Sequence, residues 1–266
     1  MSRLAWPLLV LGALAGWAAV ARAEDEHVGL QDQLATAKWT EVAPGIEQLN
    51  VPDPLAGSFA AYRLAQDKVT ARVLAPLKPS GSTAEEVMAA SKALLVVNGG
   101  FFWIKPSGAL APTGLLVVDG VKLAGMKKCR ACSAVLYTDV KGLHIGRPVE
   151  LSGKRGILSA LQTGPMLVEA GKAQDYKADG PAAARTAVCT TGQSIIVVAS
   201  VQPMTLYDLA ALMASAPGEG GFGCQEAINL DGGPSTQLAS GPPYAGQSLG
   251  FPIAVGVQNF VAFFQR

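Results

Sequence analysis

The residues best suited to chemistry lie in the segment Asn229–Thr236, which reads Asn-Leu-Asp-Gly-Gly-Pro-Ser-Thr. It follows a short apolar run, residues 227–228, that is typical of the end of a strand. Glycine pairs reach backbone conformations closed to other residues and let a ligand approach main-chain amides. Such a turn can hold an anion beside the carboxylate of Asp231. The alternative is a plain tight turn in which Asp231 bonds its own backbone.

Three other segments place small or polar residues next to an expected apolar strand: Asn98-Gly99-Gly100, Gln162-Thr163-Gly164 and Arg185-Thr186. Because each segment abuts a strand, each can present side chains at a strand end. Histidine contributes little, since the chain has only two. His27 lies near the N-terminus and His144 in an expected strand, where a structural role is favoured. A Ser-His-Asp triad or a histidine-rich metal site is therefore not expected.

Length and composition favour one folded domain. The chain has 266 residues, of which 50% are hydrophobic and 15% charged, so it can bury a core and is too apolar for disorder. Residues 1–23 combine a basic start, an apolar middle and small residues at positions 21 and 23, which predicts a cleaved signal peptide. A retained membrane anchor is the alternative. We expect a flexible segment over residues 24–40 and the folded domain over residues 41–266.

Charge and cysteine content bear on compartment and partners. Cleavage removes Arg3 and Arg22 from 21 basic residues, which leaves 19 against 20 acidic ones and no basic run. Nucleic acid and stable membrane insertion are therefore not expected. An exported protein, periplasmic or secreted, forms disulfides. Four cysteines allow three pairings, and we favour Cys129–Cys132 and Cys189–Cys224. A redox role for the first pair is a weaker alternative.

The expected fold is α+β, with a largely antiparallel mixed sheet and a few flanking helices in a single domain. A capping box predicts a helix from Thr83 to about Ala93. The segment Thr205-Leu206-Tyr207-Asp208 predicts the start of a second helix, to about Ala214, whose apolar residues share one face. Strand patterns predict two hairpins, one joining 59–64 to 69–74 and one over 115–123 around an Asp-Gly turn. The expected remainder is a long loop over 238–252, a last strand over 253–264, and shorter strands at 46–51, 94–97, 134–138, 142–146, 166–169, 186–190 and 195–200.

The four polar segments, in this order and at comparable spacing, resemble the phosphodiester glycosidase family over about residues 69–264. Enzymes of that family release a sugar from a sugar-1-phosphodiester. The resemblance therefore implies a carbohydrate phosphodiester as substrate. The leaving group is a phosphate monoester, already a stable anion, so holding negative charge matters more than donating a proton.

The resemblance implies roles for particular residues. Arg185, Asp231 and Asn98 are the catalytic candidates. The guanidinium of Arg185 would grip phosphate, unless it forms a structural salt bridge. Asp231 would attack the anomeric carbon, activate water or orient another group. Asn98 would bond the sugar or orient Asp231, unless it caps a turn. Trp103 is a candidate for stacking on a sugar. The substrate-binding candidates are Gly99, Gly100, Gln162, Thr163, Gly164, Thr186, Gly232, Gly233, Ser235 and Thr236.

Two points of chemistry stay open at this stage. Most glycosidases use a second carboxylate. Glu169 and Asp119 are within reach by sequence, although each is also typical of a solvated hairpin residue. The chain has Gly100 where the family often has an acid, which puts in question any metal or catalytic role of that acid. No cofactor is expected, although Asp231 and Asn98 could share a divalent cation such as calcium with backbone carbonyls.

We therefore expect an exported hydrolase that cleaves a glycosyl-1-phosphodiester in a cell-envelope polymer or exopolysaccharide. The alternative is a non-catalytic envelope module that binds anionic glycan through the same pocket. The sequence does not define the sugar, the stereochemical outcome or the oligomeric state.

Overall fold

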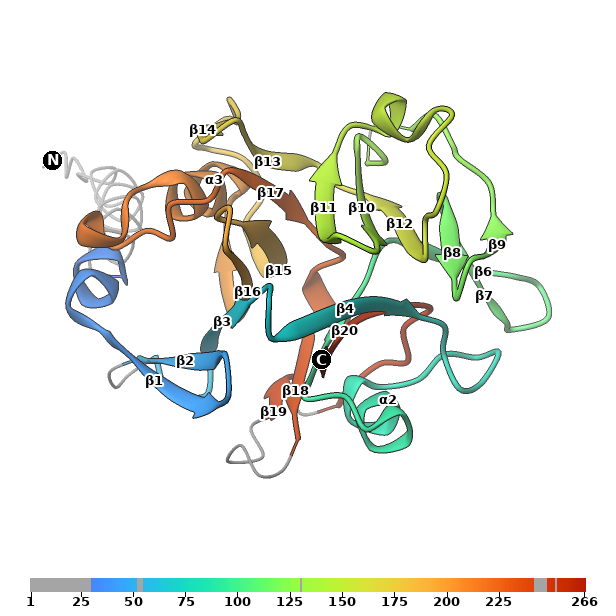
Figure 1. The fold of residues 1–266 in the computed structure, drawn as a ribbon, viewed down its shortest axis with the longest axis horizontal. Helices are drawn as coiled ribbons and strands as arrows, with labels where there is room; N and C mark the ends of the chain where they lie inside the picture. The colour runs from blue at the N-terminus through green and yellow to red at the C-terminus, as the bar shows by residue number, and fades with distance from the viewer. Residues whose placement is uncertain (1–29, 52–54, 130, 242–247, 252) are drawn as a thin grey trace, which may run out of the picture.

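The computed structural model describes residues 30–51, 55–129, 131–241, 248–251 and 253–266, and Figure 1 shows their arrangement. The predicted signal peptide lies outside these residues. The described part of segment 24–40, expected to be flexible, contains a helix over 30–36 and the start of the first strand. Leu34 of this helix is buried in an apolar cluster that includes residues of helix α3 (Leu206–Ala214), and this burial holds the segment in place.

Three antiparallel sheets and a small hairpin build the fold (Figure 1). The eight-stranded sheet has the order β1 (Lys38–Ala43), β2 (Ile46–Asn50), β3 (Phe59–Ala65), β16 (Ser194–Met204), β15 (Ala183–Thr190), β17 (Glu226–Asn229), β13 (Met166–Glu169), β14 (Lys172–Ala173). A five-stranded sheet has the order β11 (Gly142–Gly146), β10 (Ala134–Asp139), β12 (Ser159–Thr163), β8 (Leu116–Val118), β9 (Val121–Ala124). Another has the order β19 (Ser248–Gly250), β18 (Gln237–Ser240), β5 (Leu95–Asn98), β20 (Phe260–Gln265), β4 (Val69–Leu74). The hairpin pairs β6 (Phe102–Ile104) with β7 (Leu110–Pro112).

One apolar core joins the three sheets. It contains Leu64 and Ile228 from the large sheet, Leu161 from the second and Val97 and Val261 from the third, all at most 2% exposed. Because all three sheets direct side chains into it, their strand ends are fixed relative to one another. The antiparallel α+β class expected from the sequence is confirmed.

The two predicted helices cover outer faces of the sheets. Helix α2 (Ala84–Ser91) begins after Thr83, whose hydroxyl accepts a hydrogen bond from the Glu86 amide. Helix α3 begins with the same kind of capping box, formed by Thr205 and Asp208. Helix α2 packs against the sheet that contains β5 and β18, and α3 against the large sheet. Short 3₁₀ turns add η1 (Pro148–Leu151), η2 (Pro217–Glu219) and η3 (Gly233–Ser235). Among the described residues, no helix has the length and apolar character needed to cross a bilayer.

Several local predictions are wrong. The strands expected to form a hairpin, β3 and β4, belong to different sheets, because β3 is flanked by β2 and β16 while β4 pairs with β20. The loop expected over 238–252 contains most of β18 and all of β19. The last strand begins only at Phe260. Strand β12 is absent from the predicted elements, although it carries two candidate site residues.

Both favoured disulfides are present. Cys189 of β15 bonds Cys224, which precedes β17, and Cys129 bonds Cys132 in the loop after β9. The sequence separation is 35 residues for Cys189–Cys224 and only 3 for Cys129–Cys132. In the chain-entropy description, a cross-link stabilises more when it closes a longer loop.

Cys189→Ala/Cys224→Ala should therefore lower the free energy of unfolding by about 4 kcal/mol, whereas Cys129→Ala/Cys132→Ala should cost roughly 2 kcal/mol. Urea denaturation of the two double variants beside the unmodified protein measures both values. Equal losses would show that loop length does not govern the contribution of these bonds.

Candidate active site

The side chain of Asn98 hydrogen-bonds to three other parts of the chain at the candidate site. Asn98 is the last residue of β5, and its side chain is fully buried. Its Nδ2 donates to the backbone oxygen of Asp231 at 2.7 Å, and its Oδ1 accepts from the Thr186 hydroxyl at 2.7 Å and from the Gln237 amide at 3.0 Å. Asp231 in turn donates its own amide to Gly99 at 2.9 Å. Asn98 therefore joins β5, β15, β18 and the end of β17.

These bonds change the expectations for two side chains. Both lone pairs of Asn98 Oδ1 receive donors, so this oxygen is not free for a sugar hydroxyl or a cation. The Thr186 hydroxyl donates its hydrogen bond to Asn98, so toward a ligand it can only accept a hydrogen bond. In the structure both residues hold the site together rather than face an open ligand space.

Two glycines let the β5 end approach its neighbours. A Cβ on Gly99 would lie 2.0 Å from Asn259 Oδ1, and one on Gly100 would lie 2.5 Å from Leu161 Cδ1. Asn259 accepts the Gly100 amide at 2.6 Å and its carbonyl accepts the Gly99 amide at 2.8 Å. A side chain at position 100 would require Leu161 to move and would meet Thr163 Cβ at 3.0 Å, so the space beside Gly100 is filled in this chain. Asn259 supports the site but has no motif in the sequence that would have revealed it.

Arg185 and Asp231 lie on adjacent segments of the chain, in β15 and just after β17. Ala187 pairs with Asn229 in the β15–β17 ladder, and the Leu230 amide donates to Thr186 at 2.9 Å just beyond it. Continuing this antiparallel register places Arg185 opposite Asp231. Close packing agrees, because a Cβ on Gly232 would lie 2.6 Å from the Ala184 carbonyl oxygen and 4.0 Å from Arg185 Cα.

Arg185 has no carboxylate partner among the residues that the structure describes. Its Nε donates to the Met204 carbonyl at 2.9 Å and one Nη to the Pro181 carbonyl at 2.9 Å. Burial lowers the pKa of its guanidinium, because the charged form loses hydration. A fixed cation beside neutral carbonyls leaves its charge uncompensated, so an anion can bind there.

Asp231 is a partly buried carboxylate held by its own turn. Its Oδ1 accepts the Gly232 amide at 2.9 Å, and the Ser235 side chain also hydrogen-bonds to it. Burial raises the pKa of Asp231, and these two hydrogen bonds oppose the rise only in part. Gly233 has φ of 56°, and no atom lies within 4 Å of its ideal Cβ, so the turn is open on that side.

Three buried oxygens at the neighbouring strand ends have no hydrogen-bond partner in the described ranges: Thr163 Oγ1, Thr236 Oγ1 and Asn229 Oδ1. Asn229 also donates to the carbonyl of Gly164 at 3.0 Å, which links β17 to the end of β12. Buried polar atoms normally have partners, so each of these three oxygens keeps an unused capacity for a hydrogen bond. Thr163 and Thr236 are among the predicted substrate-binding residues, and Asn229 is an addition.

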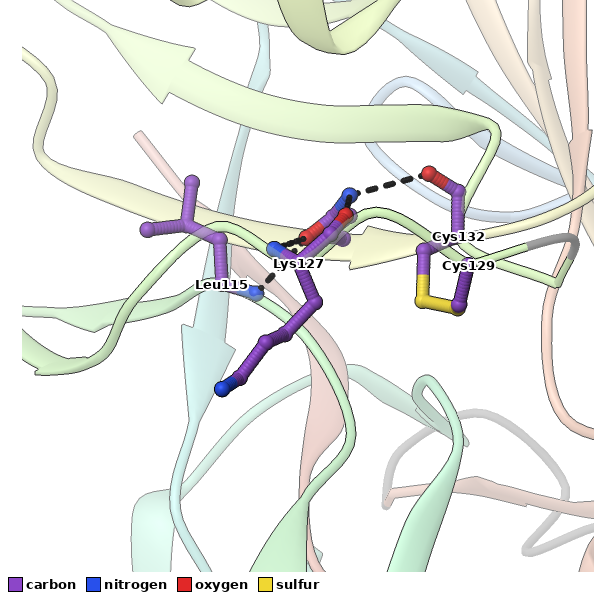
Figure 2. Close-up of a disulfide and its surroundings, with 5 residues drawn as sticks. Leu115, Lys127, Cys129 and Cys132 are labelled. Carbon is purple, nitrogen blue, oxygen red and sulfur yellow. Dashed lines mark hydrogen bonds between the residues drawn. A yellow bond between two sulfur atoms is a disulfide. The ribbon is translucent and has the colours of Figure 1, made fainter.

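Gln162 has a supporting position that the sequence did not suggest. Its side-chain oxygen accepts the amides of Leu115 and Lys127, and its nitrogen donates to the carbonyls of Lys127 and Cys132, all at 2.7–3.1 Å. Figure 2 shows Lys127 between Leu115 and the Cys129–Cys132 disulfide. All donors and acceptors of the amide are used, so it braces this loop and has no group left for a sugar.

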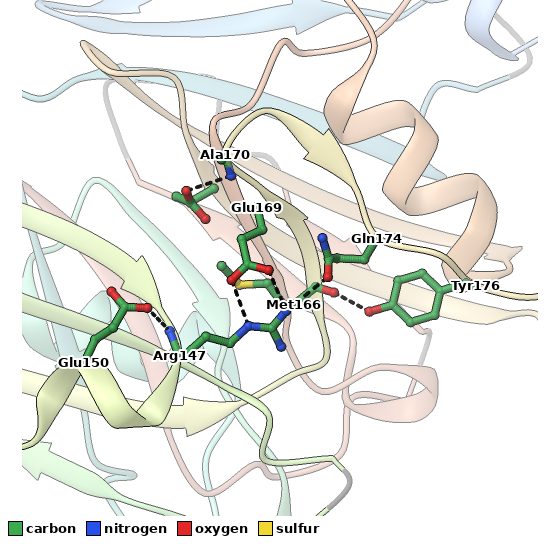
Figure 3. A network of polar contacts seen from close by, with 8 residues as sticks. Arg147, Glu150, Met166, Glu169, Ala170, Gln174 and Tyr176 are labelled. Atoms are coloured by element: carbon green, nitrogen blue, oxygen red, sulfur yellow. Dashed lines mark hydrogen bonds and ion pairs between the residues drawn. The ribbon is translucent and has the colours of Figure 1, made fainter.

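The two carboxylates considered as partners for Asp231 lie elsewhere. Glu169 forms a bidentate ion pair with Arg147, with N–O distances of 2.9 and 2.7 Å. Arg147 also donates a hydrogen bond to the side-chain oxygen of Gln174 (Figure 3). The hydrogen bonds from Arg147 lower the pKa of Glu169. Asp119 sits in the β8–β9 turn with φ of 48°. Neither hydrogen-bonds to the Asn98 network within the described chain.

Two further features lie apart from this group. His144 bonds Asp139 at 2.9 Å and stacks on Tyr137, which is a structural role. A cavity of about 400 Å³ beside Arg72, Asp119 and Asp139 includes none of the predicted site residues. Within the described ranges, no three histidine, cysteine, aspartate or glutamate side chains gather in a way that could hold a metal ion.

The raised pKa of Asp231 has a consequence for stability. A carboxyl whose pKa is raised by folding contributes stability below its unfolded pKa, about 4, and loses it as pH rises through the folded value. Asp231→Asn should therefore have a higher Tm than the unmodified protein at pH 7, with the difference shrinking toward pH 3.5. Thermal denaturation at both pH values tests this, and an unmodified protein that is the more stable at pH 7 would contradict it.

Comparisons with known proteins bear on the family and the fold of this chain. Residues 91–262 match the phosphodiester glycosidase family, while a search of curated proteins finds no significant match. The fold is similar to the catalytic domain of zebrafish N-acetylglucosamine-1-phosphodiester alpha-N-acetylglucosaminidase, auto-inhibited by its pro-peptide, with a TM-score of 0.58 and 17% identity over 86% of this chain and 88% of that one.

Two further solved structures share the fold. A hypothetical protein from Synechocystis aligns with a TM-score of 0.57 and 14% identity over 86% of this chain and 64% of its own. A protein from Burkholderia pseudomallei designated as exported aligns with a TM-score of 0.54 and 15% identity over 82% and 74%. The family match covers well over half of the sequence. Asn98 and the residues that hydrogen-bond to its side chain all lie within the matched range. The chain therefore belongs to the phosphodiester glycosidase family and is an enzyme of that class.

Proposed function

We propose that this protein is an exported hydrolase that cleaves glycosyl-1-phosphodiester linkages in a cell-envelope polymer or exopolysaccharide. One observation carries the proposal: the β15–β17 register brings the backbone of Arg185, whose guanidinium has no carboxylate partner in the described chain, opposite that of Asp231, a partly buried carboxylate. The zebrafish enzyme with the same fold is named for action on a phosphodiester of N-acetylglucosamine. The disulfides and the predicted signal peptide support export.

The chemistry follows from the leaving group. Cleavage breaks the bond between the anomeric carbon and the phosphate oxygen, and both electrons leave with the phosphate monoester. Arg185 holds this anion through two of its oxygens, and the open turn at Gly233 offers a main-chain amide beside it. Charge stabilisation of this kind is the main requirement when the leaving group needs no proton.

Asp231 acts in its ionised form in this proposal. Either it takes a proton from the water molecule that attacks the anomeric carbon, or it attacks that carbon itself and forms a glycosyl ester that water then hydrolyses. Partial burial makes the carboxylate more basic than a solvated one, which suits both roles. A single carboxylate is sufficient because the phosphate leaves without general-acid help. This is consistent with Glu169 being held in its ion pair with Arg147.

Kinetics of variants on a soluble glycosyl-1-phosphodiester test these roles. Asp231→Asn should lower kcat by about 100-fold or more, since it removes the charge that drives attack. Arg185→Ala should lower kcat/KM by a similar factor, and Arg185→Lys should recover only part of it because lysine lacks the planar fork. Glu169→Gln is the matched carboxylate control and should retain turnover. Substrate binding without turnover in the unmodified protein would favour the non-catalytic glycan-binding alternative.

The pH profile provides a separate test. Because Asp231 must be ionised and burial raises its pKa, kcat/KM should fall on the acid side with an apparent pKa above that of an ordinary aspartate, about 3.9. Initial rates between pH 3 and 8 measure this value. A rate that rises as pH falls through this range would instead assign Asp231 as a proton donor.

A further inference from the structure

We propose that a polymer surface next to the candidate site, made of Trp103, Lys127 and Lys128, binds the part of a phosphate-linked glycan chain beyond the scissile bond. The inference rests on the proposed function and extends it from a single phosphodiester to a polymer with repeated phosphates. None of the three residues takes part in the Asn98 network or in the proposed cleavage step.

Trp103 supplies an aromatic face close to the β5 end. It lies in β6, three residues after Gly100, and the residue is 51% exposed. Tryptophan is highly buried on average, so a half-exposed indole beside a candidate active site is informative. Its flat face can pack against the C–H side of a sugar ring while its N–H is left for a polar partner.

Lys127 and Lys128 supply two cations on a braced loop. Gln162 hydrogen-bonds to both the amide and the carbonyl of Lys127, and the Cys129–Cys132 disulfide closes the loop directly after them. Figure 2 shows the Lys127 side chain extending away from the disulfide. Both lysines are exposed, and neither forms an ion pair with any described residue.

A short series of contacts places the aromatic and cationic parts beside the same strand ends. The Thr113 amide donates to Phe101 at 2.9 Å, which closes the base of the hairpin that carries Trp103. Two residues later, Leu115 shares the Gln162 oxygen with Lys127. The next residue after Gln162 is Thr163, whose Cβ lies 3.0 Å from an ideal Cβ on Gly100. Trp103 and Lys127 thus lie on two segments that both adjoin the glycines of the site.

This combination selects a class of ligand. A single phosphodiester is already matched by Arg185, so two more unpaired cations imply further negative charge on the substrate. Lysine is a mobile point charge, which suits phosphates whose position varies along a flexible polymer. An aromatic face between such cations suits a sugar. Alternating sugars and phosphates therefore match the polymer surface better than a neutral glycan or a small nucleotide.

The test compares two substrates: a defined oligomer with repeated sugar-1-phosphodiester linkages, and a methyl phosphodiester of the same sugar. Lys127→Gln/Lys128→Gln should raise KM for the oligomer about tenfold, and at least five times more than KM for the methyl ester. The difference should vanish near 1 M salt, where screening acts within about 3 Å. Trp103→Ala should also raise the oligomer KM, and Trp103→Phe should restore most of the affinity.

Lys141→Gln is the matched charge control, because Lys141 lies in the turn at the opposite end of β10. It should leave both KM values unchanged. Equal effects of the lysine double variant on both substrates, or no effect on the oligomer, would overturn the inference. Failure of the unmodified protein to cleave either substrate would count against the proposed function instead. In that case calorimetric binding of the oligomer still decides the inference, since equal affinity of the unmodified protein and the double variant overturns it.

Discussion

The structure depends on one buried amide. Asn98 is fully buried, and its side chain satisfies a hydroxyl, a main-chain amide and a main-chain carbonyl that come from three other segments. No ionised side chain could do this without a large desolvation cost, and no apolar one could satisfy these groups. The amide therefore fixes where β15 and the Asp231 turn end relative to β5. Precise placement of these ends is what a site with few charged groups requires.

Close backbone approach and uncompensated charge complete the arrangement. Gly99 and Gly232 leave no room for a Cβ, so the chains beside Asn98 pack backbone to backbone. Open space lies instead at Gly233, where no atom comes within 4 Å of an ideal Cβ. Arg185 is held by two carbonyls, and the Asp231 carboxylate is kept partly dehydrated. Both charges are costly in the free protein, and under the proposed function a bound sugar phosphate would offset that cost. The arrangement suits an anion and a developing positive charge on a sugar.

Local patterns in the sequence predicted local structure well. The helix starts after Thr83 and Thr205 and the Asp-Gly hairpin follow from short-range chemistry, and all are present. Strand partners did not follow, because the pairing of β3 and β4 depends on which sheet each enters. The motif segments identified the strand ends that meet, but not the side chains that face a ligand. A side-chain amide such as that of Gln162 or Asn98 can bind either a sugar or the backbone. The residue type does not tell which, because the partner depends on the fold around it. Asn259 has no local signal at all.

The most direct test of the central claim is a crystal structure of the Asp231→Asn variant with a glycosyl-1-phosphodiester bound. The account predicts that phosphate oxygens contact the Arg185 guanidinium, with the anomeric carbon facing residue 231 and the Asn98 hydrogen bonds to Thr186 and Gln237 intact. A phosphate bound elsewhere, such as the cavity beside Arg72, with Arg185 still bonded only to Met204 and Pro181, would contradict it.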